Sequence, residues 1–171
     1  MVSLYPEGFR GLILETDTQD RPSIIIPPPL IFVAFLCAGF LLDYFFPIKL
    51  FRLSWMPRII CSGILFVISG YLALGSIGVL LRNKTPFDPS KPTVKIVHQG
   101  PFRLSRNPMY LALVFLIAAV AFFTGSLWLC LAVPVLLMVL DISAVRPEEK
   151  YLEYNFGGRY LAYKAKVRRW L

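Results

Sequence analysis

The sequence has few of the residues that build metal sites and histidine-based catalytic triads. Histidine occurs once in 171 residues, as His98, so a metal site built from several histidines is excluded. His98 also has no obvious partner near it in the sequence for a serine–histidine–aspartate triad. The three cysteines, Cys37, Cys61 and Cys130, lie in apolar runs without CxxC spacing, which favours a packing role. We therefore expect no metal.

Charged residues are also scarce, at 16% of the chain, whereas a soluble domain has about 25%. Two apolar runs, residues 24–46 and 59–81, reach the roughly 20 residues that a membrane-spanning helix needs. A third apolar block, residues 109–140, is interrupted only at 124–126, which predicts a helical hairpin. The sequence therefore predicts an all-α polytopic membrane protein with about four transmembrane helices.

The predicted organisation is a single membrane domain over the whole chain. Residues 1–23 lack the pattern of a signal peptide and are interpreted as a polar tail at the membrane surface. The last residues alternate aromatic and basic side chains, which is typical of an amphipathic helix in the membrane interface. The predicted segments are transmembrane helices at 24–46, 59–81, 108–124 and 126–145, a cytosolic loop at 82–107, and cytosolic helices at 146–171.

The net charge of +8 follows the predicted topology. With four spans, the N-terminal tail, the second loop and the C-terminal segment share one side, and they hold fifteen of the eighteen lysines and arginines. Cytosolic loops carry such an excess of basic residues, so both termini are predicted to be cytosolic. The basic residues flank spans and do not form a separate domain, so nucleic acid is not an expected partner.

In the segment 100–110, GPFRLSRNPMY, seven of the eleven residues are polar, charged, glycine or proline, yet the segment leads directly into an apolar helix. Asn107 followed by Pro108 predicts a helix N-terminus with Asn107 as its cap, and such a terminus stabilises an anionic group. The alternative is that Arg103 and Arg106 only anchor this helix to lipid headgroups. About forty residues later, residues 146–149 predict a second helix start, where acidic residues are common caps.

Small residues recur along the second predicted span. Ser62, Ser69 and Ser76 are seven residues apart, and Gly63 and Gly70 accompany them. Such a stripe lets another helix approach closely, so we predict a helix-packing face and no cofactor site.

The two polar motifs, taken together, resemble the isoprenylcysteine carboxyl methyltransferase family and the related membrane phospholipid methyltransferases. The likeness spans roughly residues 94–170, with a helical hairpin between the motifs. The matching positions are Gly100, Phe102, Arg106, Asn107, Pro108 and Tyr110, then Glu148, Glu149, Leu152, Phe156, Gly157, Tyr160 and Tyr163.

The resemblance implies S-adenosylmethionine as methyl donor, in a cytosol-facing pocket covered by the C-terminal region. No glycine fingerprint of a dinucleotide-binding fold occurs, in keeping with a different kind of cofactor site. The implied cofactor-binding residues are Val94, Lys95, Ile96, Val97, Phe102, Arg106, Asn107, Pro108, Met109, Tyr110, Glu148 and Glu149. No catalytic general base is nominated.

Two departures from the family pattern bear on the methyl acceptor. Asn107 stands where many members have histidine, and Ala144 stands where carboxyl-methylating members have the arginine associated with the substrate carboxylate. We expect a lipophilic acceptor that enters from the bilayer, with membrane lipid as the surroundings. The acceptor expected first is an isoprenylcysteine-like carboxylate, and the alternatives are a phospholipid amine or a small thiol. From another class, the chain could be a non-catalytic membrane subunit or a carrier.

Overall fold

A computed structural model describes residues 26–49, 54–85 and 95–171. In these ranges the chain is helical and has no strand, only an isolated bridge between Lys49 and Ser126. The all-α prediction is therefore confirmed, while the predicted tail 1–23 and residue Val94 lie outside the described ranges. The elements are α2 (Pro28–Phe45), α3 (Trp55–Arg82), the 3-10 helix η1 (Gly100–Arg103), α4 (Pro108–Thr124), α5 (Leu127–Leu140), the π-helix η2 (Asp141–Val145), α6 (Arg146–Phe156) and α7 (Gly158–Lys166).

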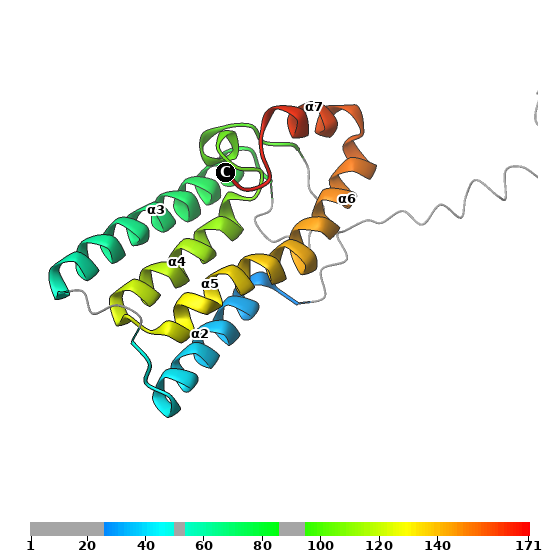
Figure 1. Cartoon of the computed structure of the whole chain (residues 1–171). Helices are drawn as coiled ribbons and strands as arrows, with labels where there is room; N and C mark the ends of the chain where they lie inside the picture. The colour runs from blue at the N-terminus through cyan, green and yellow to red at the C-terminus, as the bar shows by residue number, and fades with distance from the viewer. Residues whose placement is uncertain (1–25, 50–53, 86–94) are drawn as a thin grey trace, which may run out of the picture.

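Four long helices lie side by side in the order α3, α4, α5, α2 (Figure 1). Three helical stretches are long and apolar enough to cross a membrane: Pro28–Phe45, Trp55–Arg82 and Leu127–Phe156. The 17-residue α4 is apolar and slightly shorter. Large apolar side chains of α2, α3 and α5 remain exposed, as expected of helices that face hydrocarbon chains. The chain is a polytopic integral membrane protein.

Two serines of α3 donate hydrogen bonds to α4. Ser62 Oγ donates a hydrogen bond to the Ala119 carbonyl (2.9 Å), and Ser69 Oγ donates to the Ala112 carbonyl (2.8 Å). Ser69 follows Ser62 by seven residues in α3, and Ala112 precedes Ala119 by seven residues in α4. The two helices therefore run antiparallel. Gly63 and Gly70 are different, because a β-carbon at either position would meet open space. Of the predicted packing stripe, Ser62 and Ser69 therefore bond to α4, whereas Ser76 Oγ donates to the Leu72 carbonyl of its own helix.

The hairpin between α4 and α5 is confirmed. Gly125 follows Thr124 with φ +66°, the left-handed conformation in which glycine ends helices readily. Ser126 caps α5, since its Oγ accepts a hydrogen bond from the Leu129 N–H. Gly39 of α2 lies so close to Leu129 that an added β-carbon would be 2.4 Å from the Leu129 side chain. This close approach joins α2 to the hairpin.

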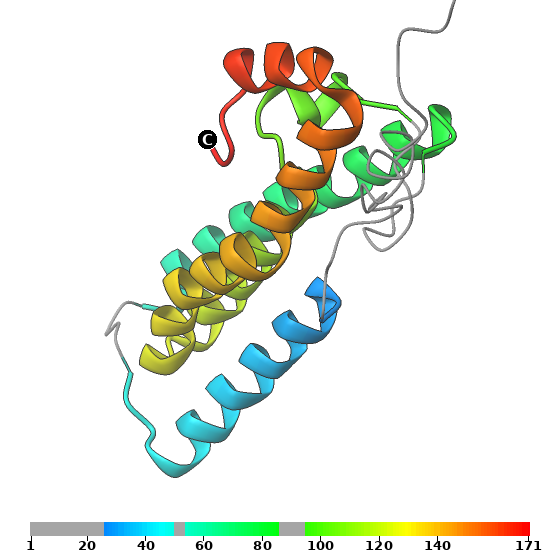
Figure 2. The same ribbon diagram turned by 90° about the vertical axis from the view of Figure 1, so that its right-hand side faces the viewer.

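Helix α5 does not end before the acidic pair. Val145 has helical φ and ψ angles, so α5, η2 and α6 form one continuous helix and the predicted helix start at residues 146–149 is wrong. The π-helical turn precedes Pro147, and π-turns and prolines are common causes of helix bending. Figure 2 shows α6 bending away from the four-helix bundle and α7 turning back across its end. The bend places the first turn of α6 near the N-terminus of α4.

Candidate active site

Tyr110 and Glu148 join the two motifs. The Tyr110 side chain extends from the first turn of α4, and its hydroxyl donates a hydrogen bond to Glu148 Oε2 at 2.7 Å. Tyr110 is buried and Glu148 is half-buried. Thus the structure brings together residues that are 38 positions apart in the sequence.

Glu149 lies next to this pair and binds two arginines. Arg106 Nη2 is 3.1 Å from Glu149 Oε1, and only 7% of the Arg106 side chain and 6% of the Glu149 side chain are exposed. Arg169 binds the same carboxylate with two hydrogen bonds, Nε to Oε1 at 3.1 Å and Nη2 to Oε2 at 2.7 Å. Arg169 Nη1 also lies 3.2 Å from Asp141 Oδ1. The hydrogen bonds to Glu149, with further help from Asp141, raise the pKa of Arg169, so this guanidinium remains charged.

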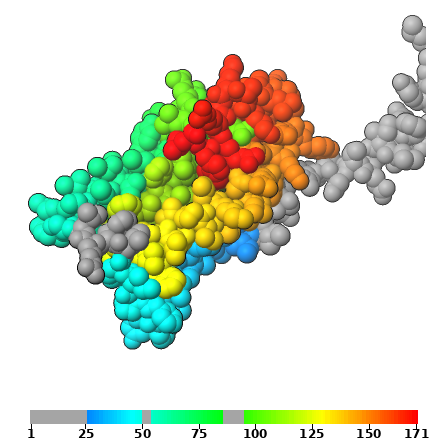
Figure 3. Space-filling model, in the orientation of Figure 1, coloured from blue at the N-terminus to red at the C-terminus, as the bar shows by residue number. Residues whose placement is uncertain are grey.

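The C-terminal tail, residues 167–171, covers the turn before α4. The Arg169 carbonyl accepts hydrogen bonds from Ser105 Oγ (2.9 Å) and Asn107 Nδ2 (3.2 Å). The Arg168 carbonyl accepts one from the Arg106 N–H (3.0 Å). Asn107 occupies the N-cap position of α4, but its side chain makes no capping bond because its amide is directed to the tail. Figure 3 shows this C-terminal segment lying between the loop before α4 and the α5–α6 helix.

Two buried tyrosines of α7 complete the polar centre. Tyr163 donates a hydrogen bond to the Phe102 carbonyl (2.7 Å), and its ring lies 4.8 Å from that of His98. Burial raises the pKa of Tyr163 to about 12, so its hydroxyl stays protonated and can donate. Burial also raises the pKa of Tyr160 above its usual range. Glu149 and Glu148 add to that rise, and Arg106 opposes it. The Tyr160 hydroxyl is therefore within electrostatic reach of all three charges.

The remaining candidate residues surround this centre less closely. Lys95, Ile96 and Val97 lie in an irregular segment before η1, and only Val97 of the three is buried. Pro108 is buried in the first turn of α4, as predicted, and Met109 is half-buried.

Sequence reasoning missed Arg169 and Asp141. Arg169 belongs to a run of basic residues that was interpreted as a membrane-surface helix, and Asp141 lies inside a predicted span. A single acidic residue within an apolar helix was the available signal for Asp141, because such residues are costly in hydrocarbon unless paired. Ala144, where the family pattern has an arginine, is completely buried. The guanidinium groups beside Glu149 come from Arg106 and Arg169.

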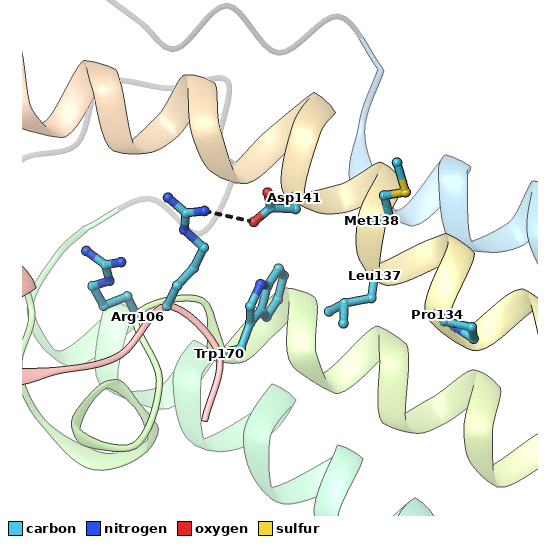
Figure 4. A pocket seen from close by; sticks show the side chains of 7 residues that line it. Arg106, Pro134, Leu137, Met138, Asp141 and Trp170 are labelled. Carbon is cyan, nitrogen blue, oxygen red and sulfur yellow. Dashed lines mark hydrogen bonds and ion pairs between the residues drawn. The ribbon is translucent and has the colours of Figure 1, made fainter.

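A groove lies beside the polar centre, with a volume of about 470 Å³. Figure 4 shows apolar side chains of α5 at one end, and Arg106 and Asp141 at the other. The dashed line at Asp141 marks its ion pair with Arg169. Met138 is well exposed on the surface of the spanning helix, so the apolar end is accessible from the side. The groove is lined by Arg106, Pro134, Leu137, Met138, Asp141, Arg169 and Trp170.

Comparison with known proteins agrees with this arrangement. Residues 56–159, more than half of the chain, match the family described as phospholipid methyltransferase. The chain belongs to the phospholipid methyltransferase family, and it is a membrane methyltransferase. An uncharacterized protein of Haemophilus influenzae is 40% identical over 63 residues, which cover 37% of this chain and 100% of that relative. No solved structure gives a significant match. The matched region contains the first motif and the second motif as far as Gly157, and it ends before Tyr160, Tyr163 and the C-terminal tail.

Proposed function

We propose that this chain transfers a methyl group from S-adenosylmethionine to a lipophilic acceptor supplied by the membrane, with both termini in the cytosol. The observation that carries the proposal is the direct contact between the turn at the start of α4 and the acidic pair of α6. The Tyr110–Glu148 hydrogen bond and the Arg106–Glu149 ion pair hold these two elements together. A polar centre of this kind at the end of membrane helices is costly unless it has a function.

The chemistry of these side chains fits the proposed cofactor. S-adenosylmethionine offers an ammonium group and ribose hydroxyls, which need hydrogen-bond acceptors, and the Glu148 carboxylate is such an acceptor. Tyr110 occupies one of the Glu148 oxygens and fixes the orientation of the carboxylate. The rings of Tyr160 and Tyr163 lie 6.2 Å apart and give the centre an apolar border. When bound, the cofactor supplies an activated methyl group on a positively charged sulfur.

The protein has to align the two reactants and exclude water. A new bond forms between the acceptor atom and the methyl carbon while the carbon–sulfur bond breaks, and the electron pair of that bond stays on sulfur. A carboxylate or thiolate acceptor needs no proton transfer, whereas an amine acceptor must be neutral when it attacks. We therefore assign binding and orientation to the side chains and nominate no general base.

The groove on α5 is the proposed entry site for the acceptor. Leu137 and Met138 lie on a membrane-spanning helix and suit an apolar chain, while Asp141 and Arg169 at the other end suit a polar head. Asp141 forms two ion pairs, one with Arg169 and one with Arg146. This arrangement favours an acidic head, as in an isoprenylcysteine-like carboxylate, over an amine. A phospholipid amine, which the family name suggests, and a small thiol are the other acceptors to assay.

The first test is calorimetric titration of the detergent-purified protein with S-adenosylhomocysteine. We expect saturable binding, and we expect Glu148→Gln to weaken it about tenfold or more because the variant loses a charged hydrogen-bond acceptor. Glu153→Gln is the matched control, since Glu153 is on the same helix and pairs with Lys164 at the surface. If folded wild-type protein does not bind at millimolar ligand, the proposal fails and a non-catalytic subunit or carrier becomes the better interpretation.

A further inference from the structure

The N-terminus of α4 is less available for an anionic group than the sequence predicts. Pro108 has no N–H, and the Asn107 N–H donates to Ser105 Oγ at 3.1 Å. The Arg106 N–H and the Asn107 amide donate to carbonyls of the C-terminal tail. These three donors beside the start of α4 are therefore already satisfied within the protein.

The unsatisfied donors are on the Arg106 side chain. Its Nη2 pairs with Glu149, but Nε and Nη1 are buried and have no hydrogen-bond partner among the residues that the structure describes. A buried guanidinium with free N–H groups is unfavourable, because these groups have lost water without a replacement. The donors of Nε and Nη1 lie on different edges of the planar guanidinium, so one carboxylate can accept a hydrogen bond from Nη1 but not from both nitrogens. The open Nη1 thus points to a missing anionic partner.

The charges around Arg106 lead to the same conclusion. Its network contains the guanidinium groups of Arg106, Arg169 and Arg146 and the carboxylates of Glu149 and Asp141, so it has one net positive charge. Glu148 has no arginine partner in the described part of the chain and is bound instead by the neutral Tyr110 hydroxyl. Glu148 adjoins Glu149, the carboxylate that Arg106 binds. Open donors on Arg106 and a carboxylate without an arginine partner therefore lie at one polar centre.

We propose that Arg106 binds the carboxylate of the cofactor's amino-acid end through Nη1, while Glu148 accepts hydrogen bonds from the adjacent ammonium group. This assignment rests on the proposed function and identifies the part of the cofactor that Arg106 recognises. One zwitterionic group then meets both the open donor of Arg106 and the carboxylate of Glu148. Glu149 acts as a positioning residue, because it holds the Arg106 side chain in place through Nη2.

The test uses two ligands that differ only in the carboxylate. S-adenosylhomocysteine and its decarboxylated analogue, which keeps the amine, are titrated into wild type, Arg106→Gln and Arg106→Lys. We expect wild type to prefer the carboxylated ligand by about 10- to 100-fold, the range for a charge-assisted hydrogen-bonded pair. This preference should disappear in Arg106→Gln and become smaller in Arg106→Lys, while binding of the analogue stays within about twofold. Arg103→Gln is the matched control, because Arg103 is exposed and three residues away.

Each outcome supports or overturns the assignment. Equal binding of the two ligands by wild-type protein refutes it, even if every Arg106 variant fails to fold. Equal loss for both ligands in a folded Arg106→Gln protein shows a structural role for Arg106 and also refutes it. Unchanged binding of both ligands by that variant refutes only the assignment, whereas absence of any binding to wild type refutes the proposed function as well. An independent measurement is thermal unfolding, in which the carboxylated ligand should stabilise wild type more than the analogue does.

Discussion

The substitution Glu149→Gln is the sharpest test of how the site is held together. It keeps the size and one acceptor oxygen of the side chain but removes the negative charge shared by Arg106 and Arg169. Arg169 keeps its ion pair with Asp141 and is about one-third exposed, so removing the Glu149 charge costs Arg169 comparatively little stabilisation. Arg106 is almost completely buried and would be left with a neutral amide as its only partner in the described part of the chain.

The expected magnitude follows from that difference in burial. Removing one partner of a buried ion pair costs about 3–5 kcal/mol, because the other charge stays buried without compensation. Because the amide oxygen can still accept a hydrogen bond, we expect Glu149→Gln to lower the unfolding free energy by about 3 kcal/mol, near the lower end of this range. Glu153→Gln makes the same chemical change four residues later in α6. Its partner Lys164 is more than one-third exposed, so we expect a loss of about 0–1 kcal/mol.

The assay is equilibrium unfolding of both variants in mixed micelles, followed by circular dichroism. The difference in unfolding free energy between them should be at least about 2 kcal/mol. If Glu149→Gln is no less stable than Glu153→Gln, then Glu149 does not neutralise a buried Arg106 and the description of the site is wrong. Greater stability of the Arg106→Gln, Glu149→Gln double variant than of Glu149→Gln would identify the uncompensated arginine as the cause.

Two further predictions concern packing and pH. Gly39→Ala should lower the unfolding free energy by about 1–3 kcal/mol, because its β-carbon would clash with the buried Leu129 side chain. Gly70→Ala is the control: its β-carbon meets open space, so the same unfolding assay should show a neutral or stabilising effect. Tyr163→Phe should cost about 1 kcal/mol at pH 8 through loss of the hydrogen bond to the Phe102 carbonyl. Since the pKa of Tyr163 is raised to about 12 in the folded protein and is about 10 in the unfolded chain, the stability advantage of wild type should persist below pH 10, vanish within about one pH unit above that and reverse by pH 12; a constant difference to pH 12 would contradict this role.

The sequence alone was sufficient for the membrane class, the hairpin and the two motifs. Apolar runs of spanning length indicate membrane helices because the bilayer imposes a minimum length and little tolerance for charge. Gly125 and Ser126 mark the hairpin because helix ends need local conformations and caps that particular residues provide. The sequence also singled out Tyr110 and Glu148 as site residues, but only through the family resemblance and not through their spacing.

The tertiary structure alone decided which polar groups are satisfied. Whether Asn107 caps its helix or binds the tail depends on Arg169, 62 residues away, and no local pattern contains that contact. Glycines and serines of α3 are alike as small residues in the sequence, but only helix packing shows that Ser62 and Ser69 face α4. The unsatisfied nitrogens of Arg106 are likewise a property of its surroundings and not of its type. Local sequence thus determined the helices and their class, while the balance of buried charge depended on contacts between distant segments.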